Sequence, residues 1–208
     1  HVYIADYDGS HARALVTTPT INVAPRWNKD SNRPLLFYSE NTNKNMRMMA
    51  VDMNKKKIMA SNFDGLNMQP TFSADGRTVV YCASRGNLNT QLYYWRNHQL
   101  KKITNNEGNS IFPSLSDDGT TLFFCSDFES KTPKIYEYDL KTEKMHKITE
   151  SGFCVSPSYC SKTNMLAYCK MVEGIDKFFT QEYKSEGIPN QTINKLSVQL
   201  SEYPNNYR

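Results

Sequence analysis

Pro70-Thr71-Phe72-Ser73-Ala74-Asp75-Gly76 begins a pattern that the chain repeats. A proline followed two residues later by a large side chain occurs four times, as Pro25-Arg26-Trp27, Pro70-Thr71-Phe72, Pro113-Ser114-Leu115 and Pro157-Ser158-Tyr159. The intervals between these prolines are 45, 43 and 44 residues. A period of about 40 to 50 residues is the length of one four-stranded blade, so the spacing predicts a β-propeller.

Each repeat also predicts four strands. The first strand ends in a turn that holds Asp75-Gly76 or Asp118-Gly119 in two copies, and Asp-Gly between apolar runs favours a hairpin. Apolar second strands follow at Leu35–Tyr38, Val79–Cys82, Leu122–Cys125 and Leu166–Cys169. Third strands alternate between apolar and more polar residues. Fourth strands end in an apolar residue followed by a residue with a hydroxyl group, as in Ile103-Thr104. Without helical periodicity, this pattern predicts an all-β protein of antiparallel blades.

The repeats set the expected boundaries. We expect a half blade at 1–18, full blades at about 24–62, 69–104 and 112–150, and a second half blade at 156–170. This partial propeller spans 1–175, and we interpret it as a fragment because the chain begins with His1 in mid-pattern. The repeats fit half of a six-bladed ring or, as the weaker alternative, a four-bladed closure that pairs the two ends. A further third strand is due near Phe178-Phe179, but the pattern then fails, so 176–208 remain an unassigned tail, disordered or aberrant.

Charge excludes some classes of function. The net charge of +4 arises from 25 basic and 21 acidic side chains that are spread along the chain, unlike the basic stripe of a nucleic-acid-binding protein. No apolar run is long enough to cross a membrane, so we expect no membrane insertion. Lys55-Lys56-Lys57 is interpreted as a solvated strand edge, with a phosphate or anionic-lipid patch as the alternative.

The five cysteines indicate packing rather than chemistry. Cys82, Cys125 and Cys169 occupy the same place in three repeats, which predicts free and mostly buried thiols. Cys154 and Cys160 would lie about 20 Å apart in an extended segment, beyond the reach of a disulfide. No Cys-x-x-Cys or Cys/His cluster occurs, so we expect neither a metal site nor a cofactor.

No catalytic arrangement is visible either. The chain lacks the Gly-x-Ser-x-Gly elbow of many serine hydrolases, and its four histidines are scattered. Asp6, Asp52 and Asp139 recur once per repeat and are therefore far apart around a ring, where capping of turns is their expected role. We expect the protein not to be an enzyme.

Strand direction indicates where a partner would bind. If the four strands of a blade alternate in direction, the loops between blades share one end of the propeller with the loops between second and third strands. The inter-blade loops enter the innermost strands and would surround the mouth of the central channel. Apolar and amide side chains there suit peptide recognition, and Phe112 either lies at this rim or packs between blades. The expected partner-binding residues are Asn22, Asn67, Met68, Gln69, Asn109, Ile111, Phe112 and Ser156.

The repeat resembles that of the TolB-type propellers. The resemblance rests on Pro-x-Phe-Ser-x-Asp-Gly at 70–76, on its copy at 113–119 and on the Ile-Thr endings, and it covers residues 1 to about 172. The opening Val2–Ser10 resembles the start of a TolB propeller. This resemblance implies a non-catalytic, monomeric, periplasmic protein of the Tol-Pal system that binds the lipoprotein Pal and the inner-membrane protein TolA, with a six-bladed propeller behind an α/β domain.

Two other classes use similar repeats. The propeller of a prolyl-oligopeptidase-like serine peptidase gates a hydrolase domain elsewhere in its chain, and it is the main alternative. A sugar lyase with a propeller fold is weaker, because it would need histidines and basic residues clustered at the channel mouth, where the chain has none.

Overall fold

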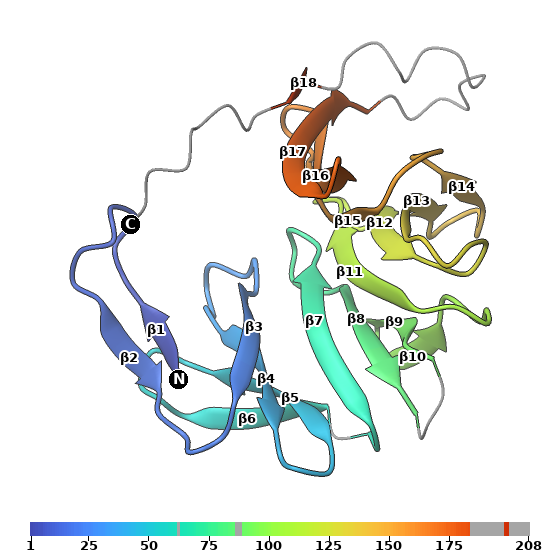
Figure 1. The fold of residues 1–208 in the computed structure, drawn as a ribbon. Helices are drawn as coiled ribbons and strands as arrows, with labels where there is room; N and C mark the ends of the chain where they lie inside the picture. The colour runs from blue at the N-terminus through green and yellow to red at the C-terminus, as the bar shows by residue number, and fades with distance from the viewer. Residues whose placement is uncertain (62, 86–88, 184–197, 200–208) are drawn as a thin grey trace.

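Every regular element of the described residues is a β-strand. The computed structural model describes residues 1–61, 63–85, 89–183 and 198–199. Within these ranges the chain forms strands β1 to β18 and no helix, so the predicted all-β class is confirmed (Figure 1). Within the same ranges, no helix is therefore available to span a membrane.

The strands follow one another in groups of four after an initial pair. The pair is β1 (Val2–Ile4) and β2 (Arg13–Val16). The next group contains β3 (Asn22–Trp27), β4 (Leu36–Asn41), β5 (Met46–Val51) and β6 (Lys57–Ser61). It is followed by β7 (Leu66–Phe72), β8 (Val79–Ser84), β9 (Gln91–Arg96) and β10 (Gln99–Lys102).

Two further groups complete the described chain. One contains β11 (Ser110–Leu115), β12 (Thr121–Ser126), β13 (Lys134–Asp139) and β14 (Met145–Lys147). The other contains β15 (Cys154–Cys160), β16 (Met165–Val172), β17 (Ile175–Glu182) and β18 (Val198–Gln199). We call the groups that begin at β3, β7, β11 and β15 blades A, B, C and D.

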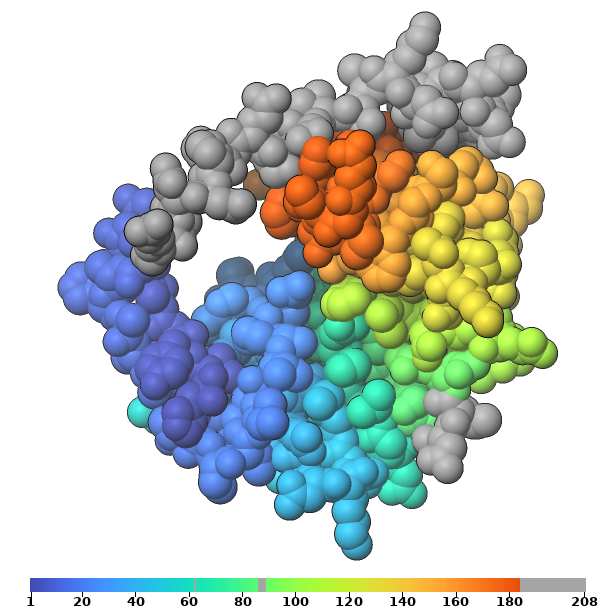
Figure 2. All heavy atoms as spheres, in the orientation of Figure 1, coloured from blue at the N-terminus to red at the C-terminus, as the bar shows by residue number. Residues whose placement is uncertain are grey.

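Each blade is an antiparallel meander, as the repeat predicts. One parallel bridge, from Met46 of β5 to Leu66 of β7, joins blades A and B along one edge. The first strands β3, β7, β11 and β15 contact one another in this order, which places them nearest the centre. The described atoms therefore form an arc of blades around a hollow middle (Figure 2).

The strand β17 extends the regular structure past residue 175, where we expected it to end. It pairs with β16 over eight residues, and Phe178 lies opposite Cys169 as the third strand requires. The connection is a two-residue turn, Glu173-Gly174, with φ angles of 53° and 77°, instead of the longer loop of the other blades. Because this turn is shorter than the corresponding loops, the spacing of the repeat changes here, and the sequence pattern of the blades is lost. The rest of the expected tail, 184–197 and 200–208, lies outside the described residues.

The hydrophobic core lies between blades, on both faces of blades A, B and C. Phe124 packs with Val80 and Cys82 of blade B, whereas its neighbour Phe123 packs with Cys154 and Leu166 of blade D. Successive side chains of a strand point to opposite faces, so a strand buried on both sides must be apolar at every position. This requirement explains the uninterrupted apolar second strands of the sequence.

Burial also sets the reactivity of the thiols. All five cysteines are free; Cys82, Cys125 and Cys154 are buried, Cys169 is half-buried and Cys160 is exposed. Burial raises the pKa of Cys125 to about 12. Hydrogen bonds from the Thr163 hydroxyl and from the backbone N–H groups of Thr163 and Lys162 lower the pKa of the exposed Cys160.

Each first strand carries a β-bulge at its proline. The register shifts between Val23 and Arg26 in β3, and the same shift recurs in β7, β11 and β15. The residue before each proline has a positive φ: 51° at Ala24, 55° at Gln69, 55° at Phe112 and 54° at Ser156. A non-glycine residue in this region costs about 1 kcal/mol or more. Proline has no N–H for the ladder, and the bulge accommodates it.

Side chains of the bulges connect neighbouring blades. Gln69 Oε1 accepts hydrogen bonds from the backbone N–H of Phe112 at 3.0 Å and from Cys82 Sγ at 3.3 Å. Blade A has Ala24 at the position of Gln69 and Ser39 at the position of Cys82. The buried Ser39 hydroxyl has no hydrogen-bond partner in the described part of the chain.

A hydroxyl after the proline forms a second connection. Thr71 Oγ1 accepts the Leu115 N–H at 3.1 Å, and Ser114 Oγ accepts the Tyr159 N–H at 3.0 Å. These residues are equivalent in the repeat, so the same hydrogen bond joins blade B to C and blade C to D. Arg26 occupies this position in blade A and has no hydroxyl.

We predict that Ala24→Gln stabilises the protein. The new amide oxygen would accept from the Ser39 hydroxyl as Gln69 accepts from Cys82, which contributes about 1 kcal/mol to the free energy of unfolding. Gln69→Ala is the matched control and should cost about 1 to 2 kcal/mol, because it removes both hydrogen bonds. Urea unfolding measures both effects. A destabilised Ala24→Gln protein would contradict the equivalence of the two interfaces.

We also predict that iodoacetamide labels Cys160 in the folded protein while Cys125 stays unlabelled. Because the pKa of Cys160 is lowered, its thiolate forms at lower pH than that of an ordinary thiol, and labelling begins earlier in a pH series. Burial and a pKa of about 12 protect Cys125 until the protein unfolds. Mass spectrometry of labelled peptides measures both rates, with Cys160→Ser as control. Equal rates at the two thiols in the native state would disprove this assignment.

Candidate functional site

One end of the propeller gathers the loops that could receive a partner. Because strands alternate in direction, the loops that enter β3, β7, β11 and β15 lie at the same end as those between the second and third strands. We call this end the rim. The turns between first and second strands, and between third and fourth strands, lie at the opposite end, which we call the turn face.

The eight residues expected at the rim differ in exposure. Asn109 and Ser156 are exposed, and Asn67 is fully buried. The other five are half-buried: Asn22, Met68, Gln69, Ile111 and Phe112.

Asn67 is fully buried, so its side chain is not exposed at the rim as we expected. Its amide donates to the carbonyl oxygens of Phe63 at 2.7 Å and Met46 at 3.0 Å, and its Oδ1 accepts from the Ser61 hydroxyl at 3.0 Å. The Asn67 amide nitrogen and oxygen are therefore both engaged in hydrogen bonds that join blade A to blade B. The equivalent residues Ser110 and Cys154 are also fully buried, so this position of the repeat faces a neighbouring blade.

The apolar members of the expected set mainly pack between blades. Met68 lies against the cluster that contains Val80 and Phe124, and Ile111 contacts the clusters on both sides of blade C. Phe112 packs against the cluster of blades C and D. Of the two roles left open for Phe112, the structure shows packing. The bulge turns these side chains toward the neighbouring blade and leaves them half-buried.

A column of exposed residues lies four positions before each proline, and the sequence prediction included only one of them, Asn109. Its members are Ile21, Leu66, Asn109 and Phe153, and we call them the rim column. Ile21 is 64% exposed, and Leu66 and Phe153 are each 37% exposed. Each stands at or just before the start of an innermost strand, so the column follows the rim from blade to blade. Its constant distance from the proline was a signal in the sequence.

Backbone hydrogen bonds hold the rim column in place. The carbonyl oxygen of Ile21 accepts the Asn41 N–H at 2.9 Å, and that of Phe153 accepts the Met171 N–H at 2.9 Å. Asn109 is fixed through its side chain, because its Oδ1 accepts the Thr90 N–H at 3.1 Å and its Nδ2 donates to Asp127 at 3.5 Å. These hydrogen bonds fix the positions of the rim-column residues before any partner binds.

A cation adds to the rim beside Leu66. The Arg85 guanidinium carbon lies 4.3 Å from the ring centroid of Phe63 and 4.9 Å from that of Tyr93. Contacts with two aromatic rings restrict the guanidinium, and Arg85 is nevertheless exposed. Phe63 is itself exposed. The rim thus combines apolar anchors, an amide and an oriented positive charge.

Acidic side chains of the turn face cap turns. Asp52 Oδ1 accepts the N–H groups of Asn54 at 2.9 Å and Lys56 at 2.8 Å. A hydrogen bond from the Ser73 hydroxyl lowers the pKa of Asp75, and the N–H groups of Thr142 and Lys141 lower the pKa of Asp139. Among the described residues, no three His, Cys, Asp or Glu side chains come together as a metal site would require.

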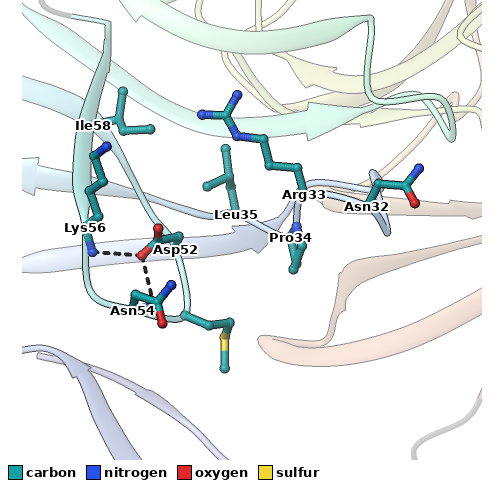
Figure 3. A pocket seen from close by; sticks show the side chains of 9 residues that line it. Asn32, Arg33, Pro34, Leu35, Asp52, Asn54, Lys56 and Ile58 are labelled. Atoms are coloured by element: carbon teal, nitrogen blue, oxygen red, sulfur yellow. Dashed lines mark hydrogen bonds between the residues drawn. The ribbon is translucent and has the colours of Figure 1, made fainter.

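The turn face of blade A contains a pocket of about 270 Å³. The turn after β3 supplies Arg33 and Pro34, and the turn after β5 supplies Asp52 and Lys56 (Figure 3). The two walls of this pocket are 17 or more residues apart in the chain, so no local sequence pattern indicates it.

Comparison with known proteins agrees with the fold. The family model described as the TolB beta propeller domain matches residues 1–207. No curated protein matches the sequence. The TolB structure from Acinetobacter baumannii is similar, with a TM-score of 0.76 and 25% identity, over 86% of this chain and 45% of that chain. A structure described as TolB from Agrobacterium tumefaciens gives a TM-score of 0.71 at 16% identity, over 82% of this chain and 61% of that chain.

Other propellers are similar at the level of the fold. The puromycin-hydrolyzing peptidase of Mycobacterium tuberculosis has a TM-score of 0.63 at 12% identity, over 86% of this chain and 33% of that chain. This chain spans less than half of the Acinetobacter TolB structure. The family match extends over nearly the whole sequence, in agreement with the four bulged prolines and the blade topology. The chain belongs to the TolB beta propeller domain family.

Proposed function

We propose that this chain is a non-catalytic protein-binding propeller whose rim docks an extended segment of a partner protein. The rim column carries this proposal. Repeated exposed side chains at one end of the innermost strands, each held by backbone hydrogen bonds, are suited to contact a segment that lies across the channel mouth.

The chemistry of the rim supports binding of this kind. Burial of an exposed Ile, Leu or Phe side chain contributes about 1 to 3 kcal/mol, so a few anchors supply useful affinity. The side chains that contribute are Ile21, Leu66 and Phe153. Asn109 offers polar contacts from an ordered position, and Arg85 offers a charge-assisted hydrogen bond. Half-buried Gln69 and exposed Ser156 lie behind the column on the same strands.

Membership of the TolB family suggests the partners. We infer a Pal-like lipoprotein and a TolA-like inner-membrane protein, in the periplasm, within the Tol-Pal system of envelope integrity and cell division. This step rests on the family alone, since the chain spans 45% of the Acinetobacter TolB structure. The rim is the part of such a protein that this chain would supply.

The gating propeller of a serine peptidase remains the alternative. Its support is the likeness to the puromycin-hydrolyzing peptidase at 12% identity, which concerns the fold only. The TolB family match favours the binding role. A gating propeller would need its channel for substrate passage, and its rim would contact a hydrolase domain of the same protein.

We predict that Leu66→Asn with Phe153→Ser weakens binding of the soluble domain of a Pal-like protein by about tenfold or more. Loss of two apolar anchors removes about 2 kcal/mol or more of binding free energy, and each 1.4 kcal/mol is tenfold in affinity. Isothermal titration calorimetry measures the affinity. Both residues are partly exposed, so the thermal unfolding midpoint should change little.

The matched control is Ile58→Ser with Met59→Ser. These residues are exposed on the outermost strand β6, away from the rim, and their change should leave the affinity unaltered. If the rim variant binds like the unaltered protein, the rim column is not the docking site. If both pairs weaken binding equally, the contact is a general apolar one and the assignment is also wrong.

A further inference from the structure

The pocket on the turn face of blade A has the chemistry of an anion site. Arg33 and Lys56 come from its two walls, and Pro34, Leu35 and Ile58 provide apolar surface (Figure 3). A volume of about 270 Å³ is sufficient for one side chain of a partner. The pocket lies at the end of the propeller opposite the rim column, so it is separate from the docking site proposed above.

A local insertion builds one wall of this pocket. The distance from the proline to the last aromatic residue of the second strand is 13 residues in blade A, from Pro25 to Tyr38, and 11 residues in the other three blades. The two extra residues fall in the turn that contains Arg33 and Pro34. Blades B and C have a tight Asp-Gly turn at the same place. The pocket is therefore a feature of this blade and not of the repeat.

The positive charges around the pocket lack acidic partners. Arg33, Lys55, Lys56 and Lys57 form no ion pair within the part of the chain that the structure describes. Other lysines on the protein are paired: Lys29 with Asp117, Lys101 with Glu143, and Lys147 with Glu129 and Glu150.

Asp52 is the one carboxylate among the residues that line the pocket, and its Oδ1 already accepts hydrogen bonds. Asp52 Oδ1 accepts two backbone N–H groups of its own turn, as the dashed lines of Figure 3 show. Asp30, in the turn after β3, likewise accepts the Asn32 N–H at 3.0 Å. Arg33 and Lys56 line the pocket beside the single carboxylate of Asp52, and Lys55 and Lys57 flank Lys56 in the chain, so positive charge exceeds negative charge at this site.

We propose that this pocket binds a glutamate or aspartate side chain of an acidic, extended protein segment. The planar guanidinium of Arg33 matches a carboxylate in a two-point hydrogen bond, and Lys56 adds a second charge from the other wall. The apolar wall of Pro34 and Ile58 takes the methylene groups of the same side chain.

The adjoining strand favours a peptide as the occupant. β6 is the outermost strand of blade A and pairs with β5 alone among the described strands, so its other edge has backbone groups free for an added strand. Lysines on such an edge repel a second copy of the strand and attract an acidic one. A flat membrane surface would reach the lysine side chains but would not fill a concave pocket.

The experiment uses a fluorescein-labelled oligoglutamate peptide, with oligoglutamine as the neutral counterpart. Fluorescence anisotropy should show binding of oligoglutamate alone, and the affinity should fall as salt increases. Arg33→Gln should weaken binding by about tenfold, because a hydrogen-bonded charge pair is lost. Arg33→Lys, which keeps the charge and loses the planar fork, should give an intermediate loss.

The matched control pair is Lys56→Gln and Lys144→Gln. Lys144 has the same place in the turn of blade C, since the Lys56 and Lys144 carbonyls accept the N–H groups of Asp52 and Asp139 respectively. Lys56→Gln should weaken binding and Lys144→Gln should not. The thermal unfolding midpoint of each variant verifies that the fold is kept.

Three results would overturn the proposal. Equal losses in Lys56→Gln and Lys144→Gln would indicate general charge attraction. Undetectable binding of oligoglutamate would exclude an acidic segment. Arg33-dependent binding to phosphatidylglycerol vesicles, without binding to the peptide, would assign the patch to a membrane. The rim variant Leu66→Asn with Phe153→Ser should bind oligoglutamate normally, so this test is independent of the rim.

Discussion

The burial of the sheets of blades A, B and C on both faces is the constraint on which this protein depends. Consecutive residues Phe123 and Phe124 belong to two different clusters, one shared with blade D and one with blade B. Removal of one neighbouring blade would therefore expose half of the apolar strand. The same constraint explains the buried cysteines, which are small enough to fit where two sheets approach closely. Stability and shape both result from contacts between blades.

The β-bulge at each proline links the packing between blades to the exposed rim. Each first strand places a residue with positive φ before its proline, and the bulge redirects Gln69 and Phe112 toward the next blade. The residues that precede the bulge then alternate between a buried position, as at Asn67, and an exposed one, as at Leu66. Binding surface and interface are thus built from the same short segment. The cost of the strained backbone is offset by the hydrogen bonds that the bulge makes possible.

The two ends of the propeller differ in chemistry. The rim combines exposed apolar side chains with a stacked arginine, whereas the pocket on the turn face of blade A is lined by Arg33 and Lys56, which form no ion pair among the described residues. The proposals assign different partner segments to these ends: an apolar extended segment at the rim and an acidic one at the turn face. A molecule organised in this way would hold two chains on opposite sides at the same time.

The sequence alone determined the blade period, the four strands per blade, the tight Asp-Gly turns and the family, because these depend on residues close together in the chain. It also indicated which end of the propeller gathers the inter-blade loops. Only the tertiary structure decided which residues there are accessible: Asn67 is buried, whereas Ile21, Leu66 and Phe153 are exposed. It likewise extended β17 to Glu182 and formed the pocket of blade A. Exposure depends on what the adjacent blade covers, about one repeat away in sequence, and local pattern carries no information about that contact.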